Sequence, residues 1–200
     1  MHQEVALKQE QVLDEFRAAG ALLEGHFKLS SGLHSPVYLQ CAKVLMDPVR
    51  AGRLCATFAD QLRATGAQID LVVSPAMGGV VVGYEVARQL GVPGIFTERV
   101  DGEFALRRGF EIPEGARILM MEDIITTGLS SRECIKTIND WGGNVVAAGC
   151  LINRSGGRAE VGAPITALAT IDAPTYKPEE VPKAMLEIPA IKPGSRDMKA

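Results

Sequence analysis

Two adjacent carboxylates, Glu122 and Asp123, are the side chains of this sequence best placed for chemistry. They follow an apolar run over 118–121, which is typical of a strand buried on both faces. Apolar residues recur at helical spacing from Ser130 onward, which predicts a helix. The residues between this strand and this helix are β-branched, small or hydroxyl-bearing: Ile124, Ile125, Thr126, Thr127, Gly128 and Leu129.

A strand, a glycine-containing loop and a helix N-terminus together favour the binding of an anion. The first N–H groups of a helix have no intrahelical partner, and the helix dipole adds partial positive charge there. Gly128 lets the backbone approach a phosphate, while Thr126, Thr127 and Ser130 add hydroxyl donors. The carboxylates repel a phosphate, so they suit sugar hydroxyls, a metal or developing positive charge. A ribose 5-phosphate satisfies both halves of the stretch.

Turn chemistry alone is the competing explanation, because many strand-to-helix loops carry glycine and threonine. The chain has neither a G-x-x-x-x-G-K-[ST] phosphate loop nor a G-x-G-x-x-G dinucleotide motif. The loop by itself therefore leaves the structural and the functional explanation open.

Composition and charge narrow the class of protein. The chain has 200 residues, of which 46% are hydrophobic and 22% charged, with a net charge of −3. These values fit one globular domain and no electrostatic attraction to nucleic acid or membrane. No apolar run is long enough for a membrane span, and the polar N-terminus has no signal-peptide core.

Cysteine and histidine usage indicates neither a disulfide framework nor a metal site. Four widely spaced cysteines predict buried thiols in a reducing compartment, so we expect a cytoplasmic protein. His2, His26 and His34 do not form a recognisable ligand cluster.

Strands alternating with helices predict an α/β fold with a mostly parallel sheet covered on both faces. The segment 25–41 predicts an irregular hairpin, 98–113 a long exposed binding loop, and the proline-rich tail from 174 an extended appendage. Ligands of such sheets bind at the carboxyl ends of the strands, where the loops 74–79, 122–130 and 153–157 should converge. The predicted helices cover 4–19, 47–66, 80–91 and 130–141, and the predicted strands 71–73, 94–96, 118–121, 145–152 and 166–171.

Six ordered segments resemble the orotate phosphoribosyltransferases, a branch of the type I phosphoribosyltransferase family. The resemblance covers nearly the whole chain, and the acidic pair with its T-T-G loop is the part shared across the wider family. The segments are 27–36, 74–79, 106–110, 122–130, 150–157 and 188–196.

This resemblance implies the type I phosphoribosyltransferase fold in a single domain, 1–200. Residues 1–45 would form an N-terminal helix and a small hood, 68–172 the α/β core, and 173–200 a C-terminal extension. The implied activity is that of a pentosyltransferase of pyrimidine (UMP) biosynthesis. It transfers ribose 5-phosphate from 5-phospho-α-D-ribose 1-diphosphate to orotate and gives orotidine 5′-monophosphate and diphosphate, with Mg²⁺ as cofactor.

The resemblance also assigns roles to residues. Glu122 and Asp123 would lie by the ribose hydroxyls and act in catalysis, and Mg²⁺ would be held by substrate and water rather than by direct protein ligands. Orotate would contact Thr126, Arg154 and Lys28. The diphosphate substrate would contact the acidic pair and Ile124, Ile125, Thr126, Thr127, Gly128, Leu129, Ser130, Arg99, Ala76 and Met77, with a cis peptide between the last two.

The chain departs from the better-known short members of the family at two lysines. Ser30 stands at one of these positions and Met77 at the other, and Lys28 is the candidate substitute for the first. Arg99, Arg107 and Arg108 replace lysines and a histidine of the mobile loop. An arginine stays protonated, so we expect catalytic Arg107 and Arg108 to neutralise the leaving group rather than to act as general acids. Because related enzymes send this loop into a neighbouring site, we expect a homodimer with shared active sites.

Three alternatives compete with this hypothesis. One is a phosphoribosyltransferase for another nucleobase, such as a purine. Another is a non-catalytic regulator that senses phosphoribosyl diphosphate, although the sequence shows neither an added nucleic-acid-binding segment nor a basic balance. The last is an α/β scaffold with a coincidental loop, which six ordered motifs disfavour.

Overall fold

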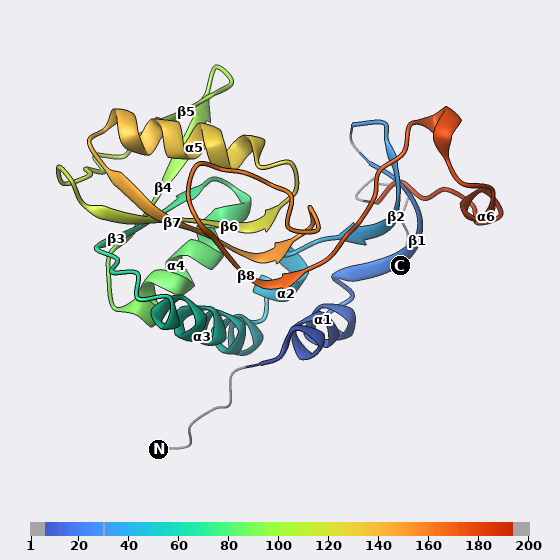
Figure 1. Cartoon of the computed structure of the whole chain (residues 1–200), viewed down its shortest axis with the longest axis horizontal. Helices are drawn as coiled ribbons and strands as arrows, with labels where there is room; N and C mark the ends of the chain where they lie inside the picture. Colours follow the sequence, from blue (N-terminus) through green and yellow to red (C-terminus); the bar gives the residue numbers. More distant parts are fainter. Residues whose placement is uncertain (1–6, 30, 194–200) are drawn as a thin grey trace.

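The computed structural model describes residues 7–29 and 31–193. A six-stranded sheet with the order β5-β4-β3-β6-β7-β8 forms the core, and a two-stranded sheet, β1-β2, lies beside it (Figure 1). Every neighbouring pair in the large sheet is parallel except β4 and β5. The predicted α/β fold is confirmed. The strands of the large sheet are β3 (Leu71–Pro75), β4 (Gly94–Val100), β5 (Glu103–Leu106), β6 (Arg117–Ile125), β7 (Asn144–Asn153) and β8 (Ile165–Thr170).

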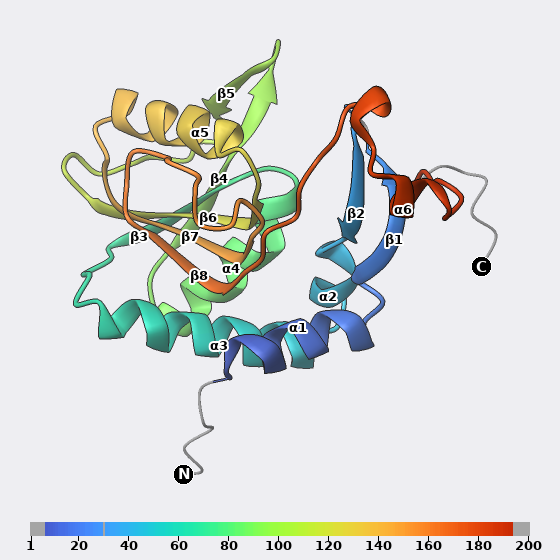
Figure 2. The ribbon, with the colours of Figure 1, turned by 45° about the vertical axis from the view of Figure 1, so that its right-hand side comes forward.

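Helices cover both faces of this sheet. Figure 2 shows α5 (Leu129–Asp140) on one side and α3 (Pro48–Ala64) with α4 (Gly78–Leu90) on the other. The central strand β6 is buried on both sides, so its alternate residues pack into different clusters. Ile118 and Met120 pack in the cluster that contains α5, whereas Leu119 and Met121 pack in the cluster that contains α3 and α4.

The helix boundaries follow from local capping. Asp47 accepts hydrogen bonds from the backbone N–H groups of Val49, at 3.0 Å, and Arg50, at 3.2 Å, and Pro48 is the first helical residue of α3. Gly91 closes α4 in the left-handed conformation, with φ of 75°, which glycine adopts without steric cost. Both signals were readable in the sequence, and both helices are confirmed.

The small sheet forms a hood beside the core. β1 (Leu22–Lys28) pairs antiparallel with β2 (His34–Leu39), so the predicted hairpin over 25–41 is more regular than expected. We call this β1-β2 hairpin the hood. It is preceded by α1 (Gln9–Ala18) and followed by α2 (Ala42–Leu45), a short helix that the sequence pattern did not predict. Residues 4–6 of the predicted first helix and Ser30 lie outside the described residues.

The C-terminal extension crosses from β8 to the hood, as Figures 1 and 2 both show. It contains η1 (Pro178–Glu180) and α6 (Lys183–Leu186). Isolated bridges join Phe27 to Ile191 and His34 to Tyr176. The Nε2 atom of His26 and the Nδ1 atom of His34 lie 2.5 Å apart, a contact between hood strands that the sequence did not predict. The last part of the motif over 188–196, residues 194–196, lies outside the described residues.

The long exposed loop predicted over 98–113 is wrong in its first half. β4 continues to Val100, and β5 turns back along it with Thr97 opposite Leu106 and Val100 opposite Glu103. The turn is Asp101-Gly102, whose φ angles of 51° and 92° are both positive. Such a two-residue turn is typical of a tight β-hairpin. This D-G pair was the signal that could have revealed the hairpin.

All four cysteines, Cys41, Cys55, Cys134 and Cys150, are buried and unpaired, as the sequence predicted. Among the described residues, none of the helices combines the length and the apolar character that crossing a membrane requires.

Candidate active site

Three strand ends bring the predicted loops to one edge of the sheet. β3 leads into the turn before α4, β6 into the loop before α5, and β7 into Arg154. In Figure 1 the arrows of β7 and β8 point toward the hood, so this edge faces it. Hydrogen bonds from Arg154 to hood residues confirm the closeness of the two parts. The predicted convergence of these loops is therefore confirmed.

Glu122 and Asp123 project from opposite faces of β6, because consecutive strand residues alternate. Glu122 faces α5 and accepts a short hydrogen bond from the hydroxyl of Ser131. Burial raises the pKa of Glu122 to about 7, and the neighbouring Asp123 adds to the increase, while the Ser131 hydrogen bond opposes it. This carboxyl group therefore holds its proton near neutral pH far more than an exposed glutamate does.

Asp123 faces the start of α4. Its Oδ1 atom accepts a hydrogen bond of 2.8 Å from the backbone N–H of Ile124, and burial raises its pKa. A Cβ atom placed on Gly78 would lie 3.0 Å from the same oxygen, so glycine leaves the carboxylate room beside the turn. Within residues 7–29 and 31–193, neither Asp123 nor Glu122 forms an ion pair.

The loop before α5 is a helix N-terminus with a left-handed glycine. Gly128 has φ of 74°, and α5 begins at Leu129, one residue before the predicted start. The guanidinium of Arg132 donates to the carbonyl of Thr127 at 3.1 Å and to that of Glu160 at 2.7 Å. Arg132 therefore fastens the loop to the segment between β7 and β8. The sequence offered no signal for this role, because Arg132 resembles any polar residue of a helix.

The turn between β3 and α4 contains a cis peptide bond between Ala76 and Met77, as the resemblance implied. The Ala76 N–H donates to the Thr97 carbonyl at 2.8 Å, which joins the turn to β4. The Met77 side chain is 83% exposed. This turn therefore presents backbone groups and an apolar side chain to solvent, but no cationic side chain.

Arg154 is partly buried beside the hood. Its Nη2 atom donates to the Ser35 hydroxyl at 2.6 Å and to the Val37 carbonyl at 3.3 Å, and its buried Nε has no hydrogen-bond partner among the described residues. Burial lowers the pKa of this arginine. It lines a cavity of about 260 Å³ whose walls are Thr126, Thr127, Arg154, Ser155, Arg158, Ala173, Pro174 and Thr175.

The structure thus brings Arg154 together with Thr126, as predicted for orotate contacts, and adds a wall from the C-terminal extension. Lys28, the third predicted contact, is exposed at the end of β1, and its backbone N–H pairs with the Ile191 carbonyl. Ser35 and Ser131 are site-adjacent residues that sequence reasoning did not single out, although Ser35 lies within the 27–36 segment.

Arg99 and Arg108, two arginines of the β4-β5 region, pair with acids other than Glu122 and Asp123. Arg99 pairs with Glu133 at 2.5 Å, and Arg108 pairs with Glu98 at 2.7 Å. The side chain of Arg107 is exposed and makes no hydrogen bond or ion pair with the described residues, although its backbone carbonyl accepts from the Phe110 N–H at 3.1 Å. β5 is three positions from β6 in the sheet order. With strands about 4.8 Å apart, β5 lies about 14 Å from the acidic pair.

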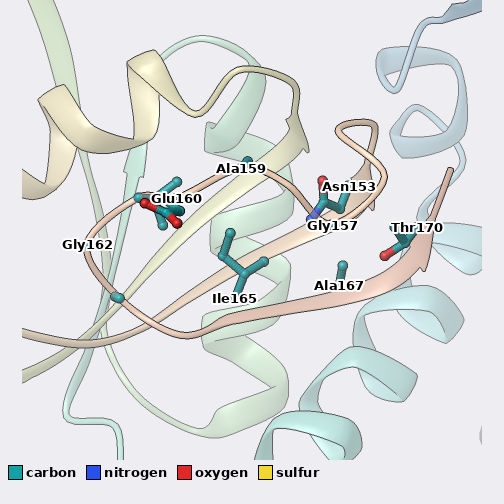
Figure 3. Close-up of a pocket in the computed structure, with 10 residues that line it drawn as sticks. Asn153, Gly157, Ala159, Glu160, Gly162, Ile165, Ala167 and Thr170 are labelled. Carbon is teal, nitrogen blue, oxygen red and sulfur yellow. The ribbon is translucent and has the colours of Figure 1, made fainter. Parts of the chain in front are cut away.

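The largest cavity does not coincide with this site. It has a volume of about 680 Å³ and lies between β7, β8 and the loop that joins them (Figure 3). Small or backbone-exposing residues such as Gly157, Ala159 and Gly162 form much of its wall. It contains none of the predicted substrate contacts, so we assign the chemistry to the smaller cavity and the strand ends.

Comparison with known proteins agrees with this geometry. The phosphoribosyl transferase domain family matches residues 47–182. The orotate phosphoribosyltransferase of Methylobacterium sp. (strain 4-46) is 60% identical over 186 residues, which cover 92% of this chain and 95% of that protein. That of Phenylobacterium zucineum (strain HLK1) is 56% identical over 193 residues, covering 96% and 100%. The crystal structure of orotate phosphoribosyltransferase from Aeropyrum pernix is 25% identical, with a TM-score of 0.64, and covers 80% of this chain and 93% of that one.

Proposed function

Because the chain belongs to the orotate phosphoribosyltransferases of the phosphoribosyl transferase family, we propose that its crevice joins N1 of orotate to C1′ of 5-phospho-α-D-ribose 1-diphosphate. The products are orotidine 5′-monophosphate and diphosphate. The observation that carries this proposal is that one edge of the sheet holds both carboxylates and a guanidinium without ion-pair partners in the described part of the chain. Among the described residues, the buried Glu122 and the half-buried Asp123 form no ion pair with a cation, and the half-buried Arg154 forms none with an acid.

The carboxylates suit the ribose. Glu122 and Asp123 sit at the end of β6 just before the anion-binding loop, so a ribose whose phosphate binds that loop lies beside them. Bond breaking at C1′ develops positive charge on the sugar, which fixed carboxylates stabilise. Glu122 must be ionised to do so, and a cationic transition state lowers the pKa that burial has raised.

The 5′-phosphate suits the start of α5. Residues 126–130 offer hydroxyl groups and the unpaired N–H groups of the first helical turn. Arg132 donates to the Thr127 carbonyl, which orients the loop, and its guanidinium lies beside Gly128. The residues in this segment that we propose as contacts are Ile124, Ile125, Thr126, Thr127, Gly128, Leu129 and Ser130.

The diphosphate would lie against Ala76 and Met77, neither of which has a cationic side chain. Mg²⁺ fits this arrangement because it prefers oxygen ligands and retains waters, so substrate oxygens would be its main ligands. Asp123 is the carboxylate beside the turn, with the space left by Gly78 next to it. When bound, the ion neutralises charge on the leaving diphosphate.

Orotate suits the cavity that Arg154 and Thr126 share. Its carboxylate supplies the counter-charge that Arg154 lacks, and a charged hydrogen bond there is worth about 1.5–3 kcal/mol. Lys28 is a further candidate contact if the hood closes over the base. A purine has no carboxylate to offer, so this cavity favours orotate over the other nucleobases.

The activity is tested by mixing the protein with orotate, phosphoribosyl diphosphate and Mg²⁺ and following the loss of orotate absorbance. We expect turnover with orotate and none with adenine or hypoxanthine. Uracil, which is orotate without its carboxylate, is the matched control for the role of Arg154 and should react far more slowly. Turnover with a purine instead of orotate would contradict the assignment.

We further propose a homodimer with shared sites. Two observations support it. Arg107 and Arg108 directly follow β5, and strand spacing places β5 about 14 Å from β6 of the same subunit, farther than a side chain reaches. Met77, Val81 and Tyr84, which are 83%, 51% and 70% exposed, form an apolar stripe at the start of α4. Such a stripe suits the face that a second copy covers.

Complementation tests the shared site. Arg154→Ala removes base recognition, and Arg107→Ala/Arg108→Ala removes the hairpin cations. If the hairpin serves the partner's site, random mixing of the two variants restores up to about one quarter of wild-type activity, since about half the dimers are mixed and each has one intact site. Mixed dimers that form without any recovery would show that the hairpin serves its own subunit. The four buried free thiols also support a reducing, cytoplasmic compartment as part of this proposal.

A further inference from the structure

We propose that Ser35 is a positioning residue for base recognition, because its hydroxyl holds the guanidinium of Arg154 in place. This inference rests on the proposed function. Ser35 belongs to β2 of the hood, is fully buried, and lies 119 positions before Arg154 in the chain. The hydrogen bond between its Oγ and Arg154 Nη2 is 2.6 Å long. The hood and the core thus meet at the side chain expected to contact the base.

Both side-chain hydrogen bonds of Arg154 go to the hood, and both start from the same nitrogen. Nη2 contacts Ser35 and the Val37 carbonyl, which leaves Nε and Nη1 without partners among the described residues. An arginine side chain has several rotatable bonds, so its free N–H groups have no fixed direction unless something holds the guanidinium. Fixing Nη2 sets the plane of the guanidinium and therefore the direction of Nη1, while Nε stays buried.

Ser35 is itself held in place. Its Oγ also accepts a hydrogen bond of 3.2 Å from the Val37 N–H, across Pro36. A hydroxyl oxygen can accept two hydrogen bonds, so Val37 and Arg154 together satisfy it. The local hydrogen bond across Pro36 in β2 therefore couples the position of the hood to that of Arg154. The competing explanation is that Ser35 only stabilises β2.

A double-mutant cycle separates the two explanations. Ser35→Ala should raise the orotate KM about tenfold, with kcat and the KM for phosphoribosyl diphosphate changed less than about twofold, because one hydrogen bond to a charged group is lost. In an Arg154→Ala background the same change should alter kcat/KM for orotate less than about twofold, since the group that Ser35 positions is gone. Ser31→Ala, in the turn of the same hairpin, is the control and should match wild type.

Ser35→Cys keeps the size of the side chain but offers only a weak acceptor, so it gives the same cycle if Ser35→Ala does not fold. Thermal unfolding of each variant reports loss of the hood fold. Equal losses in both backgrounds, or equal losses for both substrates, would overturn the positioning role and leave Ser35 with a structural role in β2. A wild-type enzyme that converts no orotate in the same assay would overturn the proposed function and this inference with it.

Discussion

The charged side chains at the carboxyl edge of the sheet differ from those of the β4-β5 hairpin in burial and in ion pairing. At the edge, Glu122 is buried, Asp123 and Arg154 are half-buried, and all three lack ion-pair partners among the described residues. On the hairpin, Arg99 and Arg108 are exposed and paired with Glu133 and Glu98. Burial of an unpaired charge costs free energy, whereas an exposed pair contributes little either way.

This difference distinguishes a substrate-binding site from an ordinary protein surface. A folded chain keeps unpaired buried charges where a ligand will supply the missing partner, so the edge is built for bound substrate. Arg99 and Arg108 already have partners and must exchange Glu133 or Glu98 for a phosphate before they can act. The edge should therefore be intolerant of substitution, and the hairpin more tolerant. The predictions below test that contrast, beginning with the largest effect.

Asp123→Asn should lower kcat about 10²-fold and change the KM for phosphoribosyl diphosphate little, because the carboxylate acts mainly on the charged transition state. Steady-state kinetics measures this. The control is Asp70→Asn, an aspartate at the start of β3 that pairs with Arg117 at 2.6 Å and is exposed. It should retain wild-type kcat. Unchanged turnover in Asp123→Asn with only a raised KM would remove Asp123 from catalysis.

Glu122→Gln should stabilise the ligand-free protein while it lowers activity. The folded pKa of about 7 lies above the ordinary value of 4.5, so this carboxyl group favours the folded state at low pH and loses that contribution as pH rises toward 7. Glutamine mimics the protonated form. The free energy of unfolding at pH 8 should therefore rise by about 2–3 kcal/mol, and at pH 5 by less than about 1 kcal/mol.

Urea unfolding of wild type and Glu122→Gln at the two pH values measures this difference. Ser131→Ala is the companion variant. It removes the hydrogen bond that favours the ionised carboxylate, so it should raise the pKa of Glu122 further. A stabilisation by Glu122→Gln that is the same at both pH values would mean that its cause is packing rather than ionisation.

We expect Arg107 and Arg108 to contribute unequally to kcat. Arg107→Ala should lower kcat about tenfold, because this exposed arginine is available for a charged hydrogen bond to the diphosphate. Arg108→Ala should cost about threefold or less, since Arg108 is held by Glu98. Glu98→Gln is the check: it releases Arg108 and should leave kcat unchanged or slightly higher. A larger loss for Arg108→Ala than for Arg107→Ala would reverse this assignment.

Local signals in the sequence were enough to predict most strands and helices of the core. The apolar run over 118–121 predicted the central strand, and Asp47-Pro48 predicted the start of α3, because each depends on neighbours within a few residues. The β4-β5 hairpin was not predicted, although the Asp101-Gly102 pair is a typical turn sequence, because the flanking strands are short, charged and half exposed. The resemblance to a family, rather than any pattern, supplied the cis bond at Ala76-Met77.

The opposite orientation of Glu122 and Asp123 was also within reach, because it continues the alternation of residues 118–121. The contact between Ser35 and Arg154 could not be predicted from the sequence. It joins segments 119 positions apart, and no local pattern encodes how the hood lies against the core. The same holds for Arg132, whose partner carbonyls at Thr127 and Glu160 become neighbours only in the folded chain.

Unpaired charges at the sheet edge should contribute far more to substrate binding than the paired, exposed ones. Two arginines four residues apart test this expectation most directly. Arg154 is partly buried without an acid, whereas Arg158 is exposed and pairs with Asp172 at 2.7 Å, although both line the same cavity. The measurement is the KM of each substrate for Arg154→Ala and Arg158→Ala.

We predict that Arg154→Ala raises the orotate KM by about ten- to a hundredfold and leaves the KM for phosphoribosyl diphosphate nearly unchanged. Arg158→Ala should stay within about threefold of wild type for both substrates. Equal losses of both substrates in Arg154→Ala, or a larger loss of orotate in Arg158→Ala, would contradict the account.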